Sequence, residues 1–489
     1  MNILLVYPNI SSGEKLPIGL AYISAVLKKE GHKVSLYDTT WDFNKEELHK
    51  CAKNVDIVGV SVLSLERNRA FDVSKILKEN YDIPIIWGGV HATVDPEDCL
   101  NTKVVDYICV GEGEYAIKEF IQKFEAGQNL HSIQNIWFLK NGKIQRNEVR
   151  PLIQELDGLP YPDRELFDMR HLCINIGSPF LGSRGCPYGC TYCVNNYYLK
   201  LYKNKGKYVR YRSVDNLLDE IEFVKEKYHI RVVEFADETV TLRKKWVREF
   251  SQKYRKRIAL PFVIQTRCDT VDLEVLQLLK NAGCQSLSFG IESGNEVLRR
   301  NVLKRKMSNE QIINALELAK KVDLPATSFN MVGMPFETES MILDTIKLNR
   351  KIKTKHHNVC IFYPFAGTEL GKISQKENLI KYHYDNLESY YHDTVLDMQQ
   401  LDRLTILTYQ KFWRFYMTFP EFLFPVMTHT FRNILRILDY LIKKTNLSIL
   451  KLIFDHLFYA FEDIQLLPSK INRRLRNYIN RLRSKNRSK

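Results

Sequence analysis

The chain has 489 residues, of which 45% are hydrophobic and 26% charged; this composition excludes a disordered or collagen-like protein, and the length exceeds one ordinary domain. No apolar stretch approaches the run of about eighteen uncharged residues that a membrane span needs, and residues 1–7 lack the features of a signal peptide, so we expect a cytoplasmic protein. The net charge of +15 is concentrated near the C-terminus, where residues 470–489 carry nine basic side chains and no acidic one.

Short apolar runs alternate with helical patterns in the first 125 residues. Strands are expected at 2–7, 33–37, 56–61, 84–87 and 107–110, and helices at 18–28, 67–78 and 115–124. Such βα units predict a doubly wound, Rossmann-like parallel sheet covered on both faces. Ligands of these folds bind beyond the carboxyl ends of the strands. The candidate residues at those ends are Ser61, Ser64, Gly88, Gly89 and Gly111.

A second βα series follows a connecting segment, in which a hairpin turn is expected at Asn141-Gly142 and a proline-rich stretch lies around Pro160. Its strands are expected to end within residues 181–183, 232–236, 262–266, 286–290, 327–332 and 358–363. Six such units predict a partial (β/α)6 barrel of the TIM type, with the active site at the C-terminal strand ends.

The remaining residues, 381–489, have a helical, basic and aromatic pattern. They are expected either to pack on the barrel or to lie on an anionic membrane surface, and RNA binding is a third, less favoured alternative. The predicted organisation is therefore a first domain at 1–135, a linker at 136–172, the barrel at 173–380 and a helical region at 381–489.

The strongest signal in the chain is Cys186-Pro-Tyr-Gly-Cys190-Thr-Tyr-Cys193. Three thiolates at this spacing can hold a four-iron cluster and leave one iron open for a substrate. A structural zinc site is the alternative; it would need a fourth ligand, for which His171 and Cys173 are the nearest residues.

This cysteine loop, with the aromatic Tyr192 before its third cysteine, resembles the radical S-adenosylmethionine (SAM) superfamily. The resemblance implies a [4Fe-4S] cluster on Cys186, Cys190 and Cys193, whose open iron binds SAM. Reductive cleavage of SAM then gives methionine and a 5′-deoxyadenosyl radical.

Segments at the later strand ends also resemble this family and imply contacts with SAM. Glu238 would face SAM, Arg267 would pair with its carboxylate, and Glu292 would bind its ribose hydroxyls. Gly333 would lie in the turn near adenine. The structural alternatives are helix capping for the acidic residues and a local salt bridge for Arg267.

The preceding doubly wound domain suggests the cobalamin (B12)-binding subfamily. Gly88, Gly89 and Gly111 would then let backbone approach the corrin or its nucleotide tail, and Ser61 or Ser64 would bind a buried polar atom. The D-x-H-x-x-G signature that supplies a cobalt-binding histidine is absent. His91 is the remaining imidazole near these loops, and a structural role is the favoured interpretation for it.

The combined resemblance implies an enzyme that uses [4Fe-4S], SAM and cobalamin to methylate an unactivated carbon. The alternatives are a cyclisation, oxidation or rearrangement without net methyl transfer, and, from another class, a non-catalytic protein that binds zinc and RNA. The expected partners are a small-molecule substrate, for which a lipid or other hydrophobic metabolite is one candidate, and an external one-electron reductant, with peripheral membrane contact through the basic C-terminal region.

Overall fold

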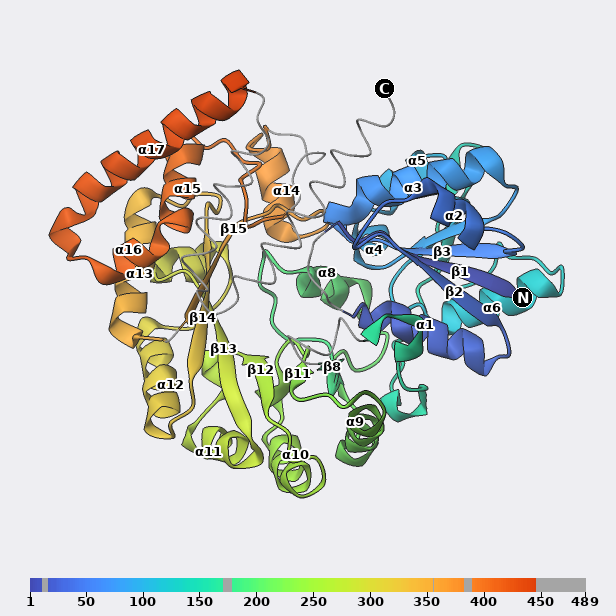
Figure 1. Cartoon of the computed structure of the whole chain (residues 1–489), viewed down its shortest axis with the longest axis horizontal. Coiled ribbons are helices and arrows are strands. Elements are labelled where there is room, and N and C mark those ends of the chain that lie inside the picture. The colour runs from blue at the N-terminus through green and yellow to red at the C-terminus, as the bar shows by residue number, and fades with distance from the viewer. Residues whose placement is uncertain (11–15, 170–177, 355, 382–388, 446–489) are drawn as a thin grey trace.

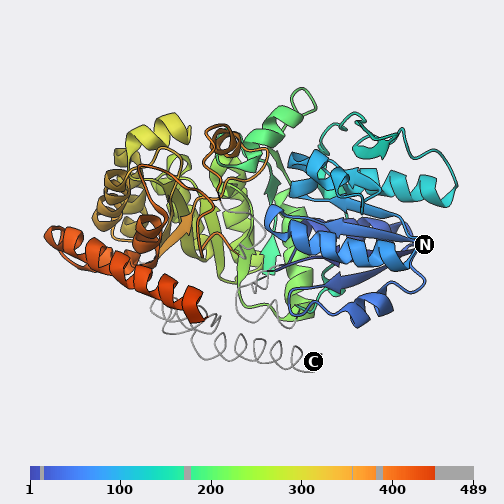
Figure 2. The same cartoon turned by 90° about the horizontal axis from the view of Figure 1, so that it is seen from above.

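The computed structural model describes residues 1–10, 16–169, 178–354, 356–381 and 389–445 (Figure 1). Two large sheets organise these residues, and the expected strands of both are present. Seen from above, the N-terminal sheet lies beside the barrel-like second sheet (Figure 2).

The N-terminal sheet has seven strands in the order β2-β1-β3-β4-β5-β6-β7, and its first five strands are parallel. Their bounds are β1 (Asn2–Tyr7), β2 (Lys33–Asp38), β3 (Ile57–Ser61), β4 (Ile85–Gly88) and β5 (Tyr107–Cys109). The hairpin of β6 (Ile136–Lys140) and β7 (Lys143–Gln145), which the sequence placed in the connecting segment, extends this sheet beyond β5.

Helices cover both faces of this sheet because alternate side chains of each strand are apolar. In β1, Leu4 and Val6 pack on one face, whereas Ile3 and Leu5 pack on the other. The first face carries α2 (Lys45–Cys51), α3 (Arg67–Asn80), α4 (Val90–Val94) and α5 (Pro96–Asn101). The second carries α1 (Ile18–Lys29) and α6 (Glu114–Glu125). The doubly wound prediction is confirmed.

The second sheet is a partial barrel of six parallel strands in the order β15-β14-β13-β12-β11-β8. The strands are β8 (Ser178–Phe180), β11 (Val233–Phe235), β12 (Phe262–Thr266), β13 (Cys284–Glu292), β14 (Ala326–Val332) and β15 (His356–Ile361). The helices between them are α9 (Val214–Tyr228), α10 (Lys244–Arg257), α11 (Leu273–Ala282), α12 (Asn309–Lys321) and α13 (Glu339–Ile352).

Side chains alternate across these strands. Phe262 and Ile264 of β12 are buried among apolar residues, many of them from the helices that surround the sheet. Gln265, the next residue along the strand, is solvent-exposed. In β13 the residues opposite the apolar set are small, including Ser288 and Gly290. Because every second side chain of a strand faces the same way, these polar and small residues line the inner face of the barrel and leave room there.

The C-terminal helices pack on the outside of the barrel. They are α15 (Arg403–Lys411), α16 (Trp413–Thr418) and α17 (Phe424–Thr445), and Ile406, Tyr416 and Leu435 anchor them in one core with β14 and α13. Helical structure was expected from residue 381, but among the described residues it begins at Arg403. None of the helices in the described ranges is long and apolar enough to cross a membrane. The predicted amphipathic segment 447–461 and the basic residues 470–489 lie outside the described residues.

Candidate active site

The cysteine loop connects β9 (Ser183–Arg184) to α8 (Val194–Leu201). Its first residue, Gly185, has a φ of +88°, and a Cβ there would lie 2.4 Å from the carbonyl oxygen of Tyr208. Only glycine fits such a turn readily. Cys190 is buried, and Cys186 and Cys193 are half-buried; all three are free thiols.

Three side chains point donors at these sulfurs. Arg267 Nη1 lies 3.8 Å and Arg305 Nη1 3.9 Å from Cys190 Sγ, and Asn195 Nδ2 lies 3.7 Å from Cys193 Sγ. Burial raises the pKa of Cys193 to about 11, so a bound metal must displace its proton. Hydrogen bonds and positive charge at the sulfurs stabilise thiolates and tune the potential of an iron–sulfur cluster.

The three sulfurs do not form the close group that a single zinc ion requires. In a tetrahedral zinc site with Zn–S bonds of 2.3 Å, the sulfurs are about 3.8 Å apart. Among the described residues, the group of potential ligands whose atoms all lie within 4.8 Å of one another is His91, Asp98 and Cys99, and not the cysteine loop. The predicted zinc alternative also involved His171 and Cys173, which lie outside the described residues.

Glu292 and Arg305 meet above the inner face of β13. A Cβ at Gly290 would lie 2.6 Å from Glu292 Oε1 and 2.9 Å from Arg305 Nη2, so the absence of a side chain at Gly290 lets these two groups approach. Arg305 Nη2 donates to the Gly290 carbonyl oxygen at 2.5 Å, and Nη1 lies 3.4 Å from the Tyr192 hydroxyl. Burial raises the pKa of Glu292, whereas the positive charge of Arg305 opposes that rise. Tyr192 and Glu292 therefore lie within one charged cluster beside Cys190.

Arg267 is buried and makes a two-point ion pair with Asp269, with nitrogen–oxygen distances of 2.8 and 2.7 Å. Its guanidinium carbon also lies 3.5 Å from the ring centroid of Tyr188. The local salt bridge named as the alternative for Arg267 is thus present, and Nη1 is directed at Cys190.

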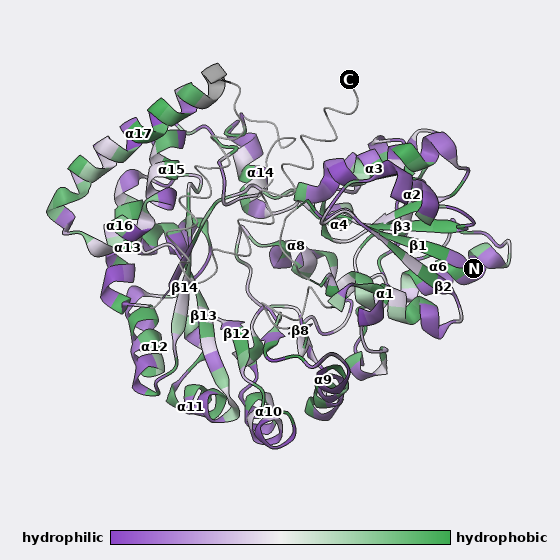
Figure 3. Ribbon diagram, viewed as in Figure 1, coloured by the Kyte–Doolittle hydropathy of each residue, from purple (hydrophilic) through white to green (hydrophobic). Residues whose placement is uncertain are grey.

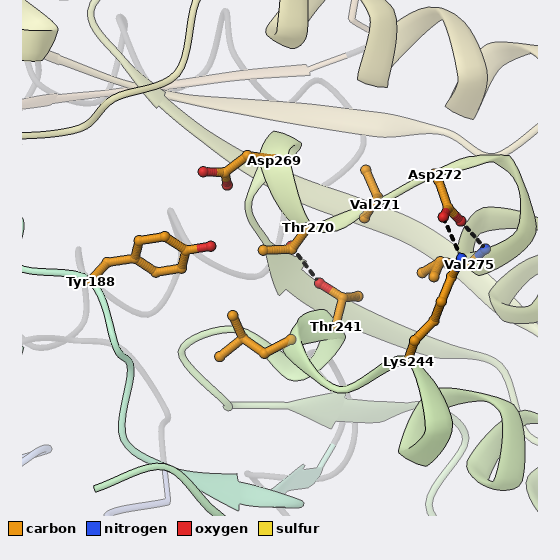
Figure 4. A pocket seen from close by; sticks show the side chains of 9 residues that line it. Tyr188, Thr241, Lys244, Asp269, Thr270, Val271, Asp272 and Val275 are labelled. Atoms are coloured by element: carbon orange, nitrogen blue, oxygen red, sulfur yellow. Dashed lines mark hydrogen bonds and ion pairs between the residues drawn. The ribbon is translucent and has the colours of Figure 1, made fainter.

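A cavity of about 350 Å³ lies between the cysteine loop and the segments that follow β11 and β12 (Figure 4). Tyr188 faces it from one side, and Thr241, Asp269 and Thr270 line the other. Thr241 and Thr270 are joined by a hydrogen bond of 2.7 Å. The cavity is small and open, and it gives solvent a route to Tyr188.

The two acidic residues after β11, Asp237 and Glu238, lie in different surroundings. Asp237 is buried and accepts a hydrogen bond of 3.0 Å from the Gly182 N–H, together with one from the Ser183 hydroxyl, and burial raises its pKa to about 6. Glu238 is exposed to solvent, yet the surrounding protein raises its pKa as well. Asp237 therefore fixes the strand that leads to the cysteine loop, and Glu238 is the member of the pair that is accessible to a ligand.

Gly333, with a φ of +78°, forms the turn after β14. Its N–H and that of Met334 both donate to one oxygen of Glu337, at 2.6 and 3.1 Å. The other oxygen, Glu337 Oε1, is buried without a hydrogen-bond partner in the described structure. Burial raises the pKa of Glu337 to about 8, against the effect of these N–H donors.

The raised pKa of Glu337 predicts a loss of stability in mild alkali. The folded state holds this proton more tightly than the unfolded state. The protonated carboxyl therefore makes its full contribution to the free energy of unfolding below about pH 4.5, and this contribution is lost as pH rises through about 8. Glu337→Gln imitates the protonated form and removes this dependence. We expect the variant to gain on the order of 2–4 kcal/mol relative to the wild type between pH 5 and 8.5, measured by urea unfolding. If the free energies of unfolding of the two proteins changed with pH in parallel, the raised pKa of Glu337 would be contradicted.

At the N-terminal sheet, His91 is fully engaged by neighbours. Its Nδ1 lies 3.2 Å from Ser64 Oγ and its Nε2 3.0 Å from Asp98 Oδ2. Asp98 also forms a two-point ion pair with Arg67. Burial alone would raise the pKa of Asp98, but His91 and Arg67 lower it to about 2. His91 therefore makes structural contacts in this sheet, and Ser64 is one of its partners.

The two glycines at the carboxyl end of β4, Gly88 and Gly89, differ in the space that surrounds them. Gly89 has a φ of +93°, and a Cβ there would lie 3.0 Å from the backbone of Val62, whereas a Cβ at Gly88 would meet nothing closer than 3.8 Å. Ser61 Oγ is close to Gly89, and Leu63 exposes 45% of its surface. The close approach at Gly89 is therefore made by the Val62 backbone, whereas Gly88 has room beside it.

The close approach expected at Gly111 is made by protein. A Cβ there would lie 2.0 Å from the hydroxyl of Tyr202, at the end of α8, and that hydroxyl accepts a hydrogen bond of 2.7 Å from the Glu112 N–H. The carboxylates of Glu112 and Glu114 meet Arg184 and Arg210. This turn therefore joins the N-terminal domain to the antiparallel pair of β9 and β10 (Arg210–Tyr211) that precedes and follows the cysteine loop.

Sequence reasoning missed Arg305, Arg184 and Arg210. Arg305 follows an irregular helical turn and belongs to no recognisable motif, and it contacts Cys190 across 115 positions of the chain. The only sequence signal for Arg184 was its place just before the cysteine loop.

Comparison with known proteins agrees with this architecture. The model of the Radical SAM superfamily matches residues 181–348, and that of the B12 binding domain matches residues 11–121. An uncharacterized methyltransferase of Pyrococcus horikoshii is 31% identical over 396 residues, covering 78% of this chain and 84% of its own. The anaerobic magnesium-protoporphyrin IX monomethyl ester cyclase of Rubrivivax gelatinosus is 25% identical, covering 76% and 69%. The structure of TsrM from Kitasatospora setae, a radical S-adenosylmethionine methyltransferase with cobalamin and a [4Fe-4S] cluster bound, superposes with a TM-score of 0.65 at 18% identity, covering 81% and 82%.

Proposed function

Because this chain belongs to the cobalamin-binding radical SAM enzymes, we propose that it transfers a methyl group from SAM to an unactivated carbon of a small-molecule substrate. When bound, the [4Fe-4S] cluster supplies the electron that cleaves one SAM to a 5′-deoxyadenosyl radical, and cobalamin carries the methyl group of another. The products are 5′-deoxyadenosine, methionine, S-adenosylhomocysteine and the methylated substrate.

One observation carries this proposal: the segments after β4 and β5 of the N-terminal sheet touch the segments after the barrel strands. Gly367 follows β15 and lies against Val94 of α4. A Cβ added at Gly367 would lie only 2.6 Å from the Val94 Cβ. Glu112 and Glu114, after β5, pair with Arg184 beside the cysteine loop. The carboxyl ends of both sheets, where ligands of these folds bind, therefore face each other.

On the barrel side, Cys186, Cys190 and Cys193 would hold the cluster. Arg267 and Arg305 would supply positive charge to Cys190. Glu238 and Glu292, with Gly333 and Tyr192 nearby, would position SAM.

On the other side, Ser61, Gly88 and Gly89 would bind cobalamin. Ser64 would act through His91, and Gly111 through Tyr202. Both ring nitrogens of His91 have protein partners, Ser64 and Asp98, so cobalt would be bound without this imidazole. We propose a cobalamin-binding domain at 1–135, a linker at 136–172, the barrel at 173–380 and a helical region at 381–489. The β6–β7 hairpin of the linker completes the N-terminal sheet.

Withholding cobalamin tests this proposal. Protein reconstituted with iron and sulfide but no cobalamin should still form 5′-deoxyadenosine from SAM within about threefold of the complete enzyme. It should form S-adenosylhomocysteine at least roughly a hundredfold more slowly, because nothing accepts the methyl group. Equal S-adenosylhomocysteine formation with and without cobalamin would contradict methyl transfer through this cofactor, and its absence from the complete enzyme would favour the cyclisation or oxidation alternative.

We further propose that the C-terminal region contacts an anionic membrane and that the substrate is a lipid or similar hydrophobic molecule. Phe422, Val426, Ile437 and Tyr440 expose 78%, 65%, 59% and 60% of their surfaces along α17 and the turn before it, where apolar and polar positions alternate (Figure 3). An exposed apolar helix face whose chain continues in sequence into a strongly basic segment is typical of binding to negatively charged lipid headgroups.

Deletion of residues 470–489 should weaken binding to vesicles that contain phosphatidylglycerol by about tenfold or more, given about 1 kcal/mol for each basic residue near the surface. Flotation with neutral phosphatidylcholine vesicles is the control. Unchanged binding after the deletion, combined with unchanged binding of Ile437→Ser, would exclude the membrane contact.

A further inference from the structure

The turn formed by residues 111–114 holds both ends of the cysteine loop. Before the loop, Arg184 Nη2 lies 2.7 Å from Glu114 Oε1, and its Nη1 lies 3.3 Å from Glu112 Oε1. After the loop and α8, the Tyr202 hydroxyl accepts the Glu112 N–H at 2.7 Å. Arg184 lies two positions before Cys186, and α8 begins directly after Cys193.

A second arginine, on the strand that pairs with β9, completes the contact. Arg210 Nη1 lies 2.9 Å from Glu112 Oε1 and also donates to the Ile153 carbonyl oxygen at 2.8 Å. Glu112 Oε2 accepts the Ile153 N–H at 2.9 Å. The carboxylate therefore has partners from β10 (Arg210–Tyr211), from β9 and from the connecting segment.

Burial makes this contact geometrically specific. The exposed fractions of the side chains are 17% for Glu112 and Arg184, 6% for Glu114 and 5% for Arg210. Charges removed from water in this way need their partners at close range, so the two sheets are held in one relative position. Tyr202 adds an apolar anchor, since it lies within the core of the N-terminal sheet.

We infer that Glu112 and Glu114 are positioning residues that set the separation between the bound cobalamin and the cysteine-bound cluster. The inference rests on the proposed function. Methyl transfer would need both cofactors held at a fixed separation by the protein, whereas cleavage of SAM would need the cluster side alone. Small displacements of reacting groups cost large factors in rate, so loss of this contact should affect methyl transfer and spare cleavage.

The test compares Glu114→Gln and Glu112→Gln with Glu97→Gln, which removes a more exposed carboxylate of the same N-terminal domain, paired with Arg146. Each full-length protein is reconstituted with iron, sulfide and cobalamin. The readouts are iron and cobalamin content, the distance between reduced cluster and cob(II)alamin from their dipolar coupling in electron paramagnetic resonance, and formation of the two SAM products.

We expect full cofactor content, a longer or broader distance distribution, and S-adenosylhomocysteine formation reduced at least about tenfold in the Glu112 and Glu114 variants, with 5′-deoxyadenosine within about threefold. Glu97→Gln should match the wild type. The charge exchange Glu114→Arg with Arg184→Glu should partly restore the distance. Tyr202→Phe, which removes only the hydroxyl, serves if the glutamine variants do not fold, and should broaden the distance less.

An unchanged distance distribution, or an equal fall of both products, would overturn the inference. A wild-type protein that fails to bind cobalamin or the cluster would overturn the proposed function instead. The two failures are therefore distinguishable.

Discussion

Replacing Cys186, Cys190 or Cys193 by alanine abolishes SAM cleavage, with an expected fall in 5′-deoxyadenosine formation of more than about a thousandfold. In the proposed cluster each cysteine would supply one iron ligand, and two thiolates would not retain a cluster with one open iron. The measurement is anaerobic iron and sulfide content together with 5′-deoxyadenosine yield for each variant.

Cys284→Ala is the matched control, because Cys284 is a buried free thiol at the start of β13 and distant in sequence from the loop. It should keep its cluster and its activity. Cleavage of SAM by the triple alanine variant would refute the assignment of the cluster to this loop.

Arg305→Met lowers the reduction potential of the cluster and destabilises the protein. Arg305 donates toward Cys190 Sγ at 3.9 Å and faces Glu292 above Gly290, so its charge favours the more negative, reduced cluster. A hydrogen bond that involves a charged group contributes about 1.5–3 kcal/mol, which corresponds to about 60–130 mV for one electron.

The same substitution removes the positive charge that opposes the rise in the pKa of the buried Glu292, so we expect the free energy of unfolding to fall as well. Potentiometric titration followed by electron paramagnetic resonance measures the first effect, and urea unfolding of the metal-free protein measures the second. Arg305→Lys retains the charge and should shift the potential less, whereas Arg300→Met, at an exposed neighbouring position, should shift neither quantity. A wild-type potential in Arg305→Met would show that this guanidinium does not act on the cluster.

Sequence patterns were sufficient for the two sheets and for the cysteine loop because both depend on local periodicity and spacing. The strands 2–7 and 262–266 were placed correctly, since alternating or continuous apolar runs bounded by turns define them. The triplet needs only one short segment to reveal its chemistry.

The contacts that organise the site could not be predicted from the sequence, because they join distant parts of the chain. Arg184 and Glu114 are 70 positions apart, and nothing in either local sequence predicts their pairing. Gly111 illustrates the same limit: a conformationally permissive residue was expected to face a cofactor, whereas Tyr202 occupies the space beside it. Glycine indicates close approach but not the identity of the neighbour.

The most direct test of the account is quantification of both SAM products from one anaerobic reaction of the fully reconstituted protein with SAM and a one-electron reductant. The account predicts 5′-deoxyadenosine together with S-adenosylhomocysteine, with bound cobalamin required for the second. Neither product from protein that carries its [4Fe-4S] cluster would contradict it.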